Sequence, residues 1–311
     1  MSKTPEGDRP TAAGWLAEHL PDQSGRTFVV TGANTGLGYE TARALAGLGG
    51  HVIMTARDRE RGERAVDSVL DETPDATVEL RLLDLADLDS VRAFAGSIRA
   101  VDVLINNAGV MAPPRTTTEQ GHELQFGVNH LAHFALTGLL LRTLAVSRDP
   151  RVVTVTSNLH KRGRIHFDDL AGEHKYNKNK FYSQSKLANV VFGLELHRRL
   201  RANGVAMSSV LAHPGFSATN LGSHLSGPLA VVARVGTMLA QSAEMGALPQ
   251  LAAAAGPDVE SGQFLGPDGR GEMKGFPTLV EPLDAARDRE LAKKLWDISE
   301  ELTGVQFHLA P

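Results

Sequence analysis

The sequence predicts an α/β protein: one domain built on a doubly wound parallel β-sheet with helices on both faces. Three observations support this prediction. Short runs rich in valine, isoleucine and leucine alternate with helical patterns, as parallel strands joined by crossover helices require. A glycine-rich turn follows the first apolar run and opens a helix. No internal repeat, low-complexity tract or long linker divides the 311 residues.

We expect the strands at seven apolar runs. They span residues 27–31, 51–55, 78–83, 101–106, 152–157 and 206–211, with a short final one at 262–265. Most runs are apolar throughout rather than alternating, so both faces of the sheet are expected to be covered. The run 78–83 is the exception, because Glu79 and Arg81 interrupt it, and we place it nearer an edge of the sheet.

Helical patterns fill the spaces between the strands. They span residues 36–48, 59–70, 88–99, 119–146 and 181–201. Ahead of the domain, which spans residues 25–311, residues 1–24 are expected to be an N-terminal extension with a short helix. Near the other end, residues 284–302 read as a charged amphipathic helix, which either covers the domain or contacts a partner subunit.

The composition excludes several classes of function. The net charge of −4 leaves no basic footprint for nucleic acid. The chain has no cysteine, which excludes disulfides, thiolate catalysis and zinc–cysteine sites. The polar N-terminus lacks a signal-peptide core, and no apolar run reaches the roughly 18 residues that span a bilayer. We therefore expect a cytoplasmic protein without a membrane anchor.

The glycine-rich turn spans residues 31–38, with the sequence Thr-Gly-Ala-Asn-Thr-Gly-Leu-Gly. Glycines here let the backbone approach a pyrophosphate closely, and the helix N-terminus then binds it through free N–H groups. The spacing is Gly-x-x-x-Gly-x-Gly rather than the standard Gly-x-Gly-x-x-Gly, and a turn without a ligand is the alternative. The predicted dinucleotide contacts are Gly32, Asn34, Thr35, Gly36, Leu37 and Gly38.

The end of the second strand indicates which dinucleotide is preferred. A carboxylate there would bond the adenine ribose 2′-hydroxyl and select NAD, but Ala56 leaves that position uncharged. Arg57 beside it can meet a 2′-phosphate, so we expect NADP(H) to be preferred over NAD(H); an ordinary surface charge cluster is the alternative. After the third strand, Asp84 and Leu85 are expected to flank the adenine, unless Asp84 caps the following turn.

A tyrosine and a lysine four residues apart are the strongest catalytic candidates. On a helix this spacing puts both side chains on one face, where the ammonium lowers the pKa of the phenol and makes it a general acid. The spacing occurs twice, as Tyr182 with Lys186 and as Tyr176 with Lys180. We prefer Tyr182, because it opens a run of helical apolar spacing, whereas Tyr176 lies among asparagines that favour a turn. An aromatic residue that packs on the sheet is the alternative for Tyr182.

Taken together, these motifs resemble the short-chain dehydrogenase/reductase family over essentially the whole chain. The matching pieces occur in the expected order; they are residues 31–38, 84–85, 106–109, Asn129, Ser157, Tyr182 with Lys186, and 214–219. Within the family the sequence is most similar to the retinol-dehydrogenase-like branch. Residues 126–131, 185–189 and 213–215 carry that likeness, as does the gap of 182 − 157 = 25 between serine and tyrosine.

The resemblance implies a Rossmann fold and a role for each site residue. Ser157 would donate a hydrogen bond to the substrate carbonyl oxygen, and Tyr182 would be the general acid and base. Lys186 would lower the pKa of Tyr182 and hold the nicotinamide ribose, while Asn129 would hold a water that relays protons from Lys186. For Ser157 and Asn129 the alternative is a side chain that bonds nearby backbone. The remaining cofactor contacts would be Asn107, Ala108, Gly109, Pro214, Gly215 and Thr219.

The long polar loop 158–180, which follows Ser157, is expected to be functional. It holds three histidines whose spacing matches no metal site, so we expect ordinary surface residues and no metal. It also holds a basic cluster that reads as a solvated face. These residues are His160, His166 and His174, and Lys161, Arg162 and Arg164.

We therefore predict an NADP(H)-dependent oxidoreductase that interconverts a carbonyl and an alcohol, on a lipophilic small molecule. The apolar segment 221–239 is either a lid over that substrate or a helix packed permanently on the core. Membrane-bound members of the branch have an N-terminal anchor helix that this chain lacks, which weighs against a retinoid. A redox sensor that holds NADP(H) without turnover and a C=C reductase are the alternative functions. A homo-oligomer is expected, of a size that the sequence does not give.

Overall fold

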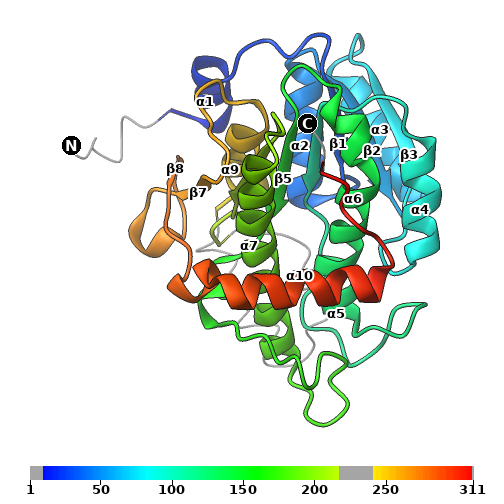
Figure 1. Ribbon diagram of the computed structural model, residues 1–311. Coiled ribbons are helices and arrows are strands. Elements are labelled where there is room, and N and C mark those ends of the chain that lie inside the picture. Colours follow the sequence, from blue (N-terminus) through cyan, green and yellow to red (C-terminus); the bar gives the residue numbers. More distant parts are fainter. Residues whose placement is uncertain (1–9, 217–240, 310–311) are drawn as a thin grey trace, which may run out of the picture.

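The computed structural model describes residues 10–216 and 241–309. One mostly parallel sheet forms the centre, with the strand order β3-β2-β1-β4-β5-β6-β7-β8 and only β8 antiparallel (Figure 1). The strands are β1 (Thr27–Val30), β2 (His51–Ala56), β3 (Val78–Leu82), β4 (Val103–Asn106), β5 (Arg151–Val155), β6 (Ser208–Ala212), β7 (Phe264–Pro267) and β8 (Pro277–Leu279). The predicted single α/β domain is confirmed. The segment 221–239 and Thr219 lie outside the described residues.

Helices cover both faces of this sheet, as the apolar strands predict. On one face the core is formed with α1 (Ala12–His19), α2 (Gly36–Gly47), α3 (Arg59–Glu72) and α9 (Ala243–Ala255). On the other it is formed with α4 (Leu88–Ser97), α6 (Ala132–Ala145), α7 (Lys178–Ala202) and α10 (Arg289–Thr303). Alternate strand residues point to opposite faces, so Phe28 and Val30 lie in one core and Val29 in the other.

The two ends of the sheet differ from one another. The predicted edge position of residues 78–83 is confirmed, because β3 is the outermost strand and none of its residues is buried. At the other end β7 begins at Phe264, slightly later than predicted, and β8 was not predicted. The sequence did not predict β8 because it has only three residues, which include Pro277 and the exposed Leu279 and show no strand pattern.

The predicted helix 119–146 is wrong at its start. Residues 117–123 form a turn around Gly121, which has a φ of 83°, and the Glu123 side chain then caps the helix by accepting from the N–H of Phe126 at 2.8 Å. Helical structure follows as α5 (Leu124–Phe126), a π-helical turn η1 (Gly127–Leu131) and α6. Such π-turns often mark functional sites, and this one carries Asn129.

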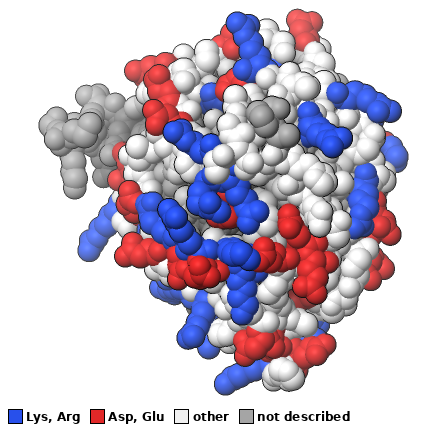
Figure 2. Space-filling model, in the orientation of Figure 1, with Lys and Arg blue, Asp and Glu red and all other residues white. Residues whose placement is uncertain are grey.

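The C-terminal helix covers the domain, which is one of the two expected arrangements. Its predicted range is split into a 3-10 turn, η5 (Asp284–Arg287), and α10, because Asp288 caps α10 by accepting from the N–H groups of Glu290 and Leu291. The helix α10 runs across α6 and α7 (Figure 1), and its residues Leu295 and Trp296 are buried. Acidic and basic side chains lie next to one another over this face (Figure 2).

The N-terminal helix α1 also packs on the domain, since Trp15 belongs to the core that α2 and α9 share. Of the helices in the described part of the chain, none combines the length and the apolar character needed to cross a bilayer.

Candidate active site

The predicted site residues gather where the parallel strands end. Parallel strands carry their carboxyl ends at one edge of the sheet, which is where ligands of doubly wound folds bind. Six predicted residues directly follow a strand or lie within the turn after it. They are Gly32, Arg57, Asp84, Asn107, Ser157 and Pro214, after β1, β2, β3, β4, β5 and β6 respectively.

Tyr182 and Lys186 enter this edge from α7. The helix begins at Lys178 because the side chain of Asn177 accepts hydrogen bonds from the N–H groups of Asn179 and Lys180. Both site side chains are buried: Tyr182 is 6% exposed and Lys186 4%. The Tyr182 hydroxyl is hydrogen bonded with the Ser157 side chain. The Lys186 Nζ donates to the Val155 carbonyl at 3.3 Å and lies 5.9 Å from the centre of the Tyr182 ring.

The predicted direction of the tyrosine pKa is wrong for the protein by itself. Burial raises the pKa of Tyr182 to about 12, and the hydrogen bond with Ser157 opposes this only in part. Burial also lowers the pKa of Lys186 to about 8. The reason is desolvation, which disfavours both the phenolate and the ammonium and which helical spacing does not reveal.

The second tyrosine has a structural environment instead. The Tyr176 hydroxyl lies 3.2 Å from Glu123 Oε1 and 3.1 Å from Gln125 Nε2, and its ring packs on Phe181. It precedes α7, as predicted, and Lys180 is exposed. Tyr176 therefore joins the loop before α7 to the turn before α5.

The Asn129 side chain is bound to the backbone. Its Oδ1 accepts from the N–H of Val110 at 2.8 Å, and its Nδ2 donates to the carbonyl of Val110 at 3.0 Å and to Ser185 Oγ at 2.9 Å. This was the alternative for Asn129. The Asn129 side chain nevertheless lies within the site, because a Cβ on Gly109 would be 3.2 Å from Asn129 Oδ1 and 3.4 Å from Lys186 Nζ. Gly109 thus lets the chain pass close to both groups.

Two residues that sequence reasoning missed hold this edge together. Thr31 Oγ1 accepts from the N–H groups of Asn107 and Ala108, at 2.9 Å each, which joins the end of β1 to that of β4. Thr31 Oγ1 also lies 2.9 Å from Nε2 of the buried His133, whose Nδ1 donates to the Asn129 carbonyl. The sequence signal for His133 was its spacing of one helical turn from Asn129.

The glycine turn has the form that a pyrophosphate needs. Gly32 and Gly36 have φ values of 64° and 58°, which disfavour other residues. A side chain on Gly38 would collide with the Gly32 carbonyl and with Asn107 Nδ2. The first N–H groups of α2, beginning at Gly36 and Leu37, have no partner within the helix and face outward from its N-terminus.

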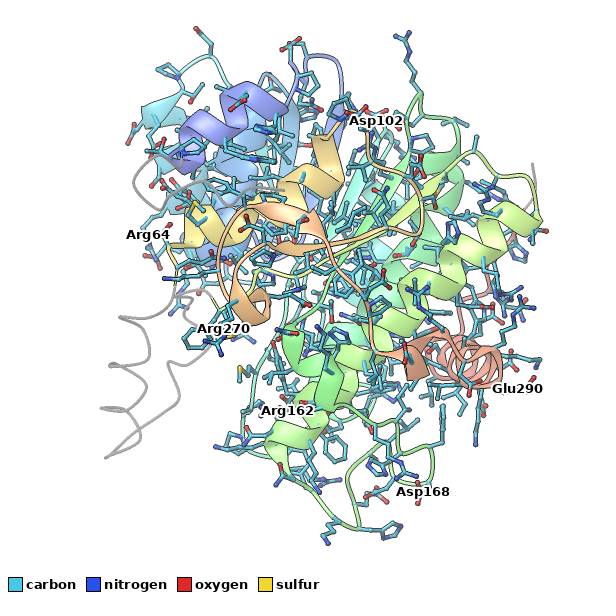
Figure 3. The ribbon with its side chains drawn as sticks, turned by 90° about the vertical axis from the view of Figure 1, so that its left-hand side faces the viewer. Arg64, Asp102, Arg162, Asp168, Arg270 and Glu290 are labelled. Atoms are coloured by element: carbon cyan, nitrogen blue, oxygen red, sulfur yellow. The ribbon has the colours of Figure 1, made fainter. Side chains whose placement is uncertain are left out.

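Beside the glycine turn lies an open cleft of about 830 Å³. Asn34, Thr35 and Gly36 line one side of it, and Arg61 and Arg64 of α3 line the other (Figure 3 labels Arg64).

Arg57 is exposed directly after β2, and its guanidinium has no ion-pair or hydrogen-bond partner among residues 10–216 and 241–309. Asp84 Oδ1 accepts from the N–H of Ala86 at 2.8 Å, so this carboxylate does cap the turn, and Leu85 beside it is buried.

The turn after β6 forms another wall of the edge. Gly215 has a φ of 68°, and a Cβ there would meet the Met273 carbonyl at 2.5 Å. The carbonyl of Pro214 accepts from Gln241 Nε2 at 2.7 Å. Both residues therefore have fixed positions beside the strand end.

The expectation of surface histidines is wrong for His160. This side chain is buried, its Nδ1 donates to the Ser157 carbonyl at 2.8 Å, and its Nε2 accepts from the N–H of Leu283. His166 and His174 are exposed as expected. Throughout residues 10–216 and 241–309, no three His, Asp or Glu side chains are grouped so as to hold a metal ion.

A doubly wound sheet with a glycine turn and a Ser–Tyr–Lys group defines a nucleotide-dependent oxidoreductase. Residues 26–227 match the family model described as short chain dehydrogenase. The chain belongs to the short-chain dehydrogenase family, in its retinol-dehydrogenase-like branch, and is an oxidoreductase of carbonyl and alcohol groups.

Three similar proteins illustrate this membership. Retinol dehydrogenase 14 of Mus musculus is 44% identical, over 90% of this chain and 86% of its own length. Polyprenol dehydrogenase of Mus musculus is 42% identical, over 92% and 86%. The crystal structure of an uncharacterised protein from Mycobacterium paratuberculosis is 43% identical, covers 96% of this chain and 98% of its own, and superposes with a TM-score of 0.79.

Proposed function

We propose that this protein interconverts a lipophilic carbonyl compound and its alcohol with NADP(H), and that Tyr182 is the general acid and base. One observation carries the proposal: a buried Tyr182 hydroxyl, hydrogen bonded with Ser157, lies one helical turn from a buried lysine at the cofactor edge of the sheet. The same edge holds Gly109 against Lys186 and Asn129.

When bound, NADP(H) supplies or accepts the hydride. The side chains supply the proton. Tyr182 stays protonated near neutral pH because its pKa is raised to about 12, so it is ready to donate a proton to the substrate oxygen during reduction. Ser157 shares the substrate oxygen with Tyr182 as a second donor. Lys186 is mostly charged near neutral pH, since its pKa is about 8, and a positive neighbour stabilises the phenolate that forms when Tyr182 gives up its proton.

Asn129 has a positioning role in this proposal, because its amide is already bound to Val110 and Ser185. Ser185 Oγ in turn donates to the carbonyl of Tyr182 at 2.8 Å. Asn129 therefore fixes the turn that carries the catalytic tyrosine and the backbone beside Gly109. Because the Asn129 side chain is already hydrogen bonded, we propose that the relay water predicted for Asn129 would be held by the backbone near this residue and not by its side chain.

Arg57 supports the preference for NADP(H). It is exposed after β2, and Arg61, on the helix that follows, lines the same cleft as Asn34 of the glycine turn. A 2′-phosphate bound there would gain charge-assisted hydrogen bonds of about 1.5–3 kcal/mol. No carboxylate occupies the position of Ala56, where one would select NAD.

Two observations support a lipophilic substrate. The relatives are named as dehydrogenases of retinol and polyprenol, which are both apolar alcohols. On this chain the side chains of Phe216 and Met273 are 43% and 46% exposed beside Gly215, at the edge where substrate would enter.

A substrate screen tests the proposal. Retinal, long-chain and short-chain aldehydes and the matching alcohols would be incubated with NADPH, NADH and their oxidised forms, with absorbance of the reduced cofactor as the readout. We expect turnover of apolar compounds with NADPH. Arg57→Ala should raise the KM for NADPH by about tenfold or more and leave that for NADH unchanged. NADPH binding without any turnover would favour the redox sensor, and a saturated product with an intact carbonyl would favour the C=C reductase.

A further inference from the structure

The buried ring of His213 joins two segments that are distant in sequence. Its Nδ1 lies 3.2 Å from the backbone nitrogen of Gly215, and its Nε2 lies 3.1 Å from Glu272 Oε2. A backbone N–H can only donate, so Nδ1 accepts, and the proton is on Nε2, which donates to the carboxylate. His213 is 0% exposed, and both of its ring nitrogens are bonded.

Glu272 bonds a second donor from the other side of the site. Its Oε1 accepts from Lys161 Nζ at 2.6 Å. Lys161 belongs to η2 (Asn158–Arg162), the turn that directly follows Ser157. The hydrogen bonds from His213 and Lys161 lower the pKa of Glu272 to about 2, so its carboxylate is ionised throughout the physiological range.

The backbone around Glu272 is fitted between the same two turns. Glu272 lies in η4 (Arg270–Glu272) and has a φ of 56°, a conformation that costs about 1 kcal/mol or more in residues other than glycine and that clusters at functional sites. On one side, the Gly271 carbonyl accepts from Asn158 Nδ2 at 2.8 Å. On the other, the Met273 carbonyl accepts from the N–H of Phe216 at 2.6 Å. In Figure 3 the label Arg270 marks η4, and the label Arg162 marks the end of η2.

We propose that Glu272 is a positioning residue that sets the distance between the two walls of the active site. One wall is the Ser157 turn, which Glu272 holds through Lys161, and the other is the Pro214–Gly215 turn, which it holds through His213. The inference rests on the proposed function, because that function gives Ser157 the substrate oxygen and NADP(H) the neighbouring space, where Pro214 and Gly215 are predicted cofactor contacts. The Ser157 turn has two supports. His160 donates to the carbonyl of Ser157, and Glu272 accepts from Lys161 of the same turn.

The substitutions at Glu272 should have graded effects. Alanine removes both hydrogen bonds and leaves the Nε2–H of a buried histidine without its acceptor. Glutamine keeps the size and one acceptor oxygen, which can serve either His213 or Lys161 but not both. Because misplacement of reacting groups by about 1 Å can cost roughly 10²-fold in rate, we expect kcat to fall about 10- to 100-fold in Glu272→Ala and about threefold to tenfold in Glu272→Gln.

The experiment compares these variants with Glu281→Ala, a matched control. Glu281 pairs with Arg287 shortly after β8, and its side chain is 85% exposed, so removing this ion pair should leave the kinetics unchanged. Steady-state kinetics with the best aldehyde from the screen give kcat and KM. Titration of NADPH by fluorescence gives its Kd, and NADPH deuterated at the transferred position gives the kinetic isotope effect.

We expect both Glu272 variants to lose kcat, to show a larger isotope effect, and to keep the NADPH Kd within about threefold, because the glycine turn and Arg57 are untouched. A merely structural role would lower the thermal midpoint without changing kcat per folded molecule or the isotope effect, and that outcome would overturn the inference. If Glu272→Ala does not fold, Glu272→Gln decides: a wild-type kcat overturns the inference and a threefold or larger loss supports it. Absence of turnover in the wild-type protein would refute the proposed function instead.

Discussion

Replacing Lys186 by methionine should abolish turnover and make the protein more stable. The Lys186 ammonium is buried, and burial lowers its pKa from 10.5 to about 8. Each pKa unit corresponds to about 1.4 kcal/mol, so the folded protein disfavours this charge by about 3 kcal/mol near neutral pH. Methionine fills a similar volume without a charge. It loses the hydrogen bond from Nζ to the Val155 carbonyl, which contributes about 1 kcal/mol.

The expected net gain in the free energy of unfolding is therefore about 2 kcal/mol for Lys186→Met near pH 7. At roughly 2.1 cal/mol/K of unfolding entropy per residue, that corresponds for a domain of this size to a rise in the thermal midpoint of about 3 °C. The assay is urea unfolding followed by circular dichroism, with Lys180→Met as the control. Lys180 lies on the same helix but is exposed, so its replacement should change stability by less than about 0.5 kcal/mol.

The pH dependence provides the sharper test. Between pH values of about 8 and 10.5, the unfolded chain keeps a proton on Lys186 that the folded protein has released, so the stability of the wild type rises with pH in this window. Below it both states are protonated and the full penalty applies. The advantage of Lys186→Met should thus be largest near pH 7 and shrink toward pH 10. A variant that is less stable than the wild type at pH 7, or a difference that does not change with pH, would refute the reasoning.

Three further predictions concern the site and its support. Tyr182→Phe should abolish turnover while NADPH binding persists, whereas the control Tyr176→Phe should keep turnover and lose about 1–2 kcal/mol of stability because a buried carboxylate loses a donor; equal kinetics of the two variants would contradict the assignment. Gly109→Ala should lower kcat/KM by about tenfold or more, because the new Cβ meets Asn129 Oδ1 at 3.2 Å, and wild-type kinetics would show that this approach does not matter. Trp296→Ala should destabilise the protein by about 3–5 kcal/mol in denaturant unfolding, because α10 loses its buried anchor; a loss below about 1 kcal/mol would mean that α10 is not part of the core.

Local pattern was enough to predict most of the fold. The alternation of apolar runs with helical patterns predicted the sheet, and the two charges in residues 78–83 predicted the edge position of β3. The glycine turn was predictable because positive φ values and close backbone approach leave few other residues. The strand β8 and the π-helical turn at Asn129 were not, because a three-residue pairing and one extra residue in a helical turn leave no periodic signal.

The sequence by itself therefore determined the family and which site residue follows each strand. It also predicted which of the two Tyr-x-x-x-Lys copies is catalytic. Only the tertiary structure decided the state of those groups. Desolvation raises the pKa of Tyr182 where helical spacing predicted a decrease, and Asn129 turned out to clamp the backbone of Val110. His213 and Glu272 meet across 59 residues of sequence. Burial and such long-range contacts depend on how distant segments pack, and no local pattern records which segments will exclude water from a given side chain.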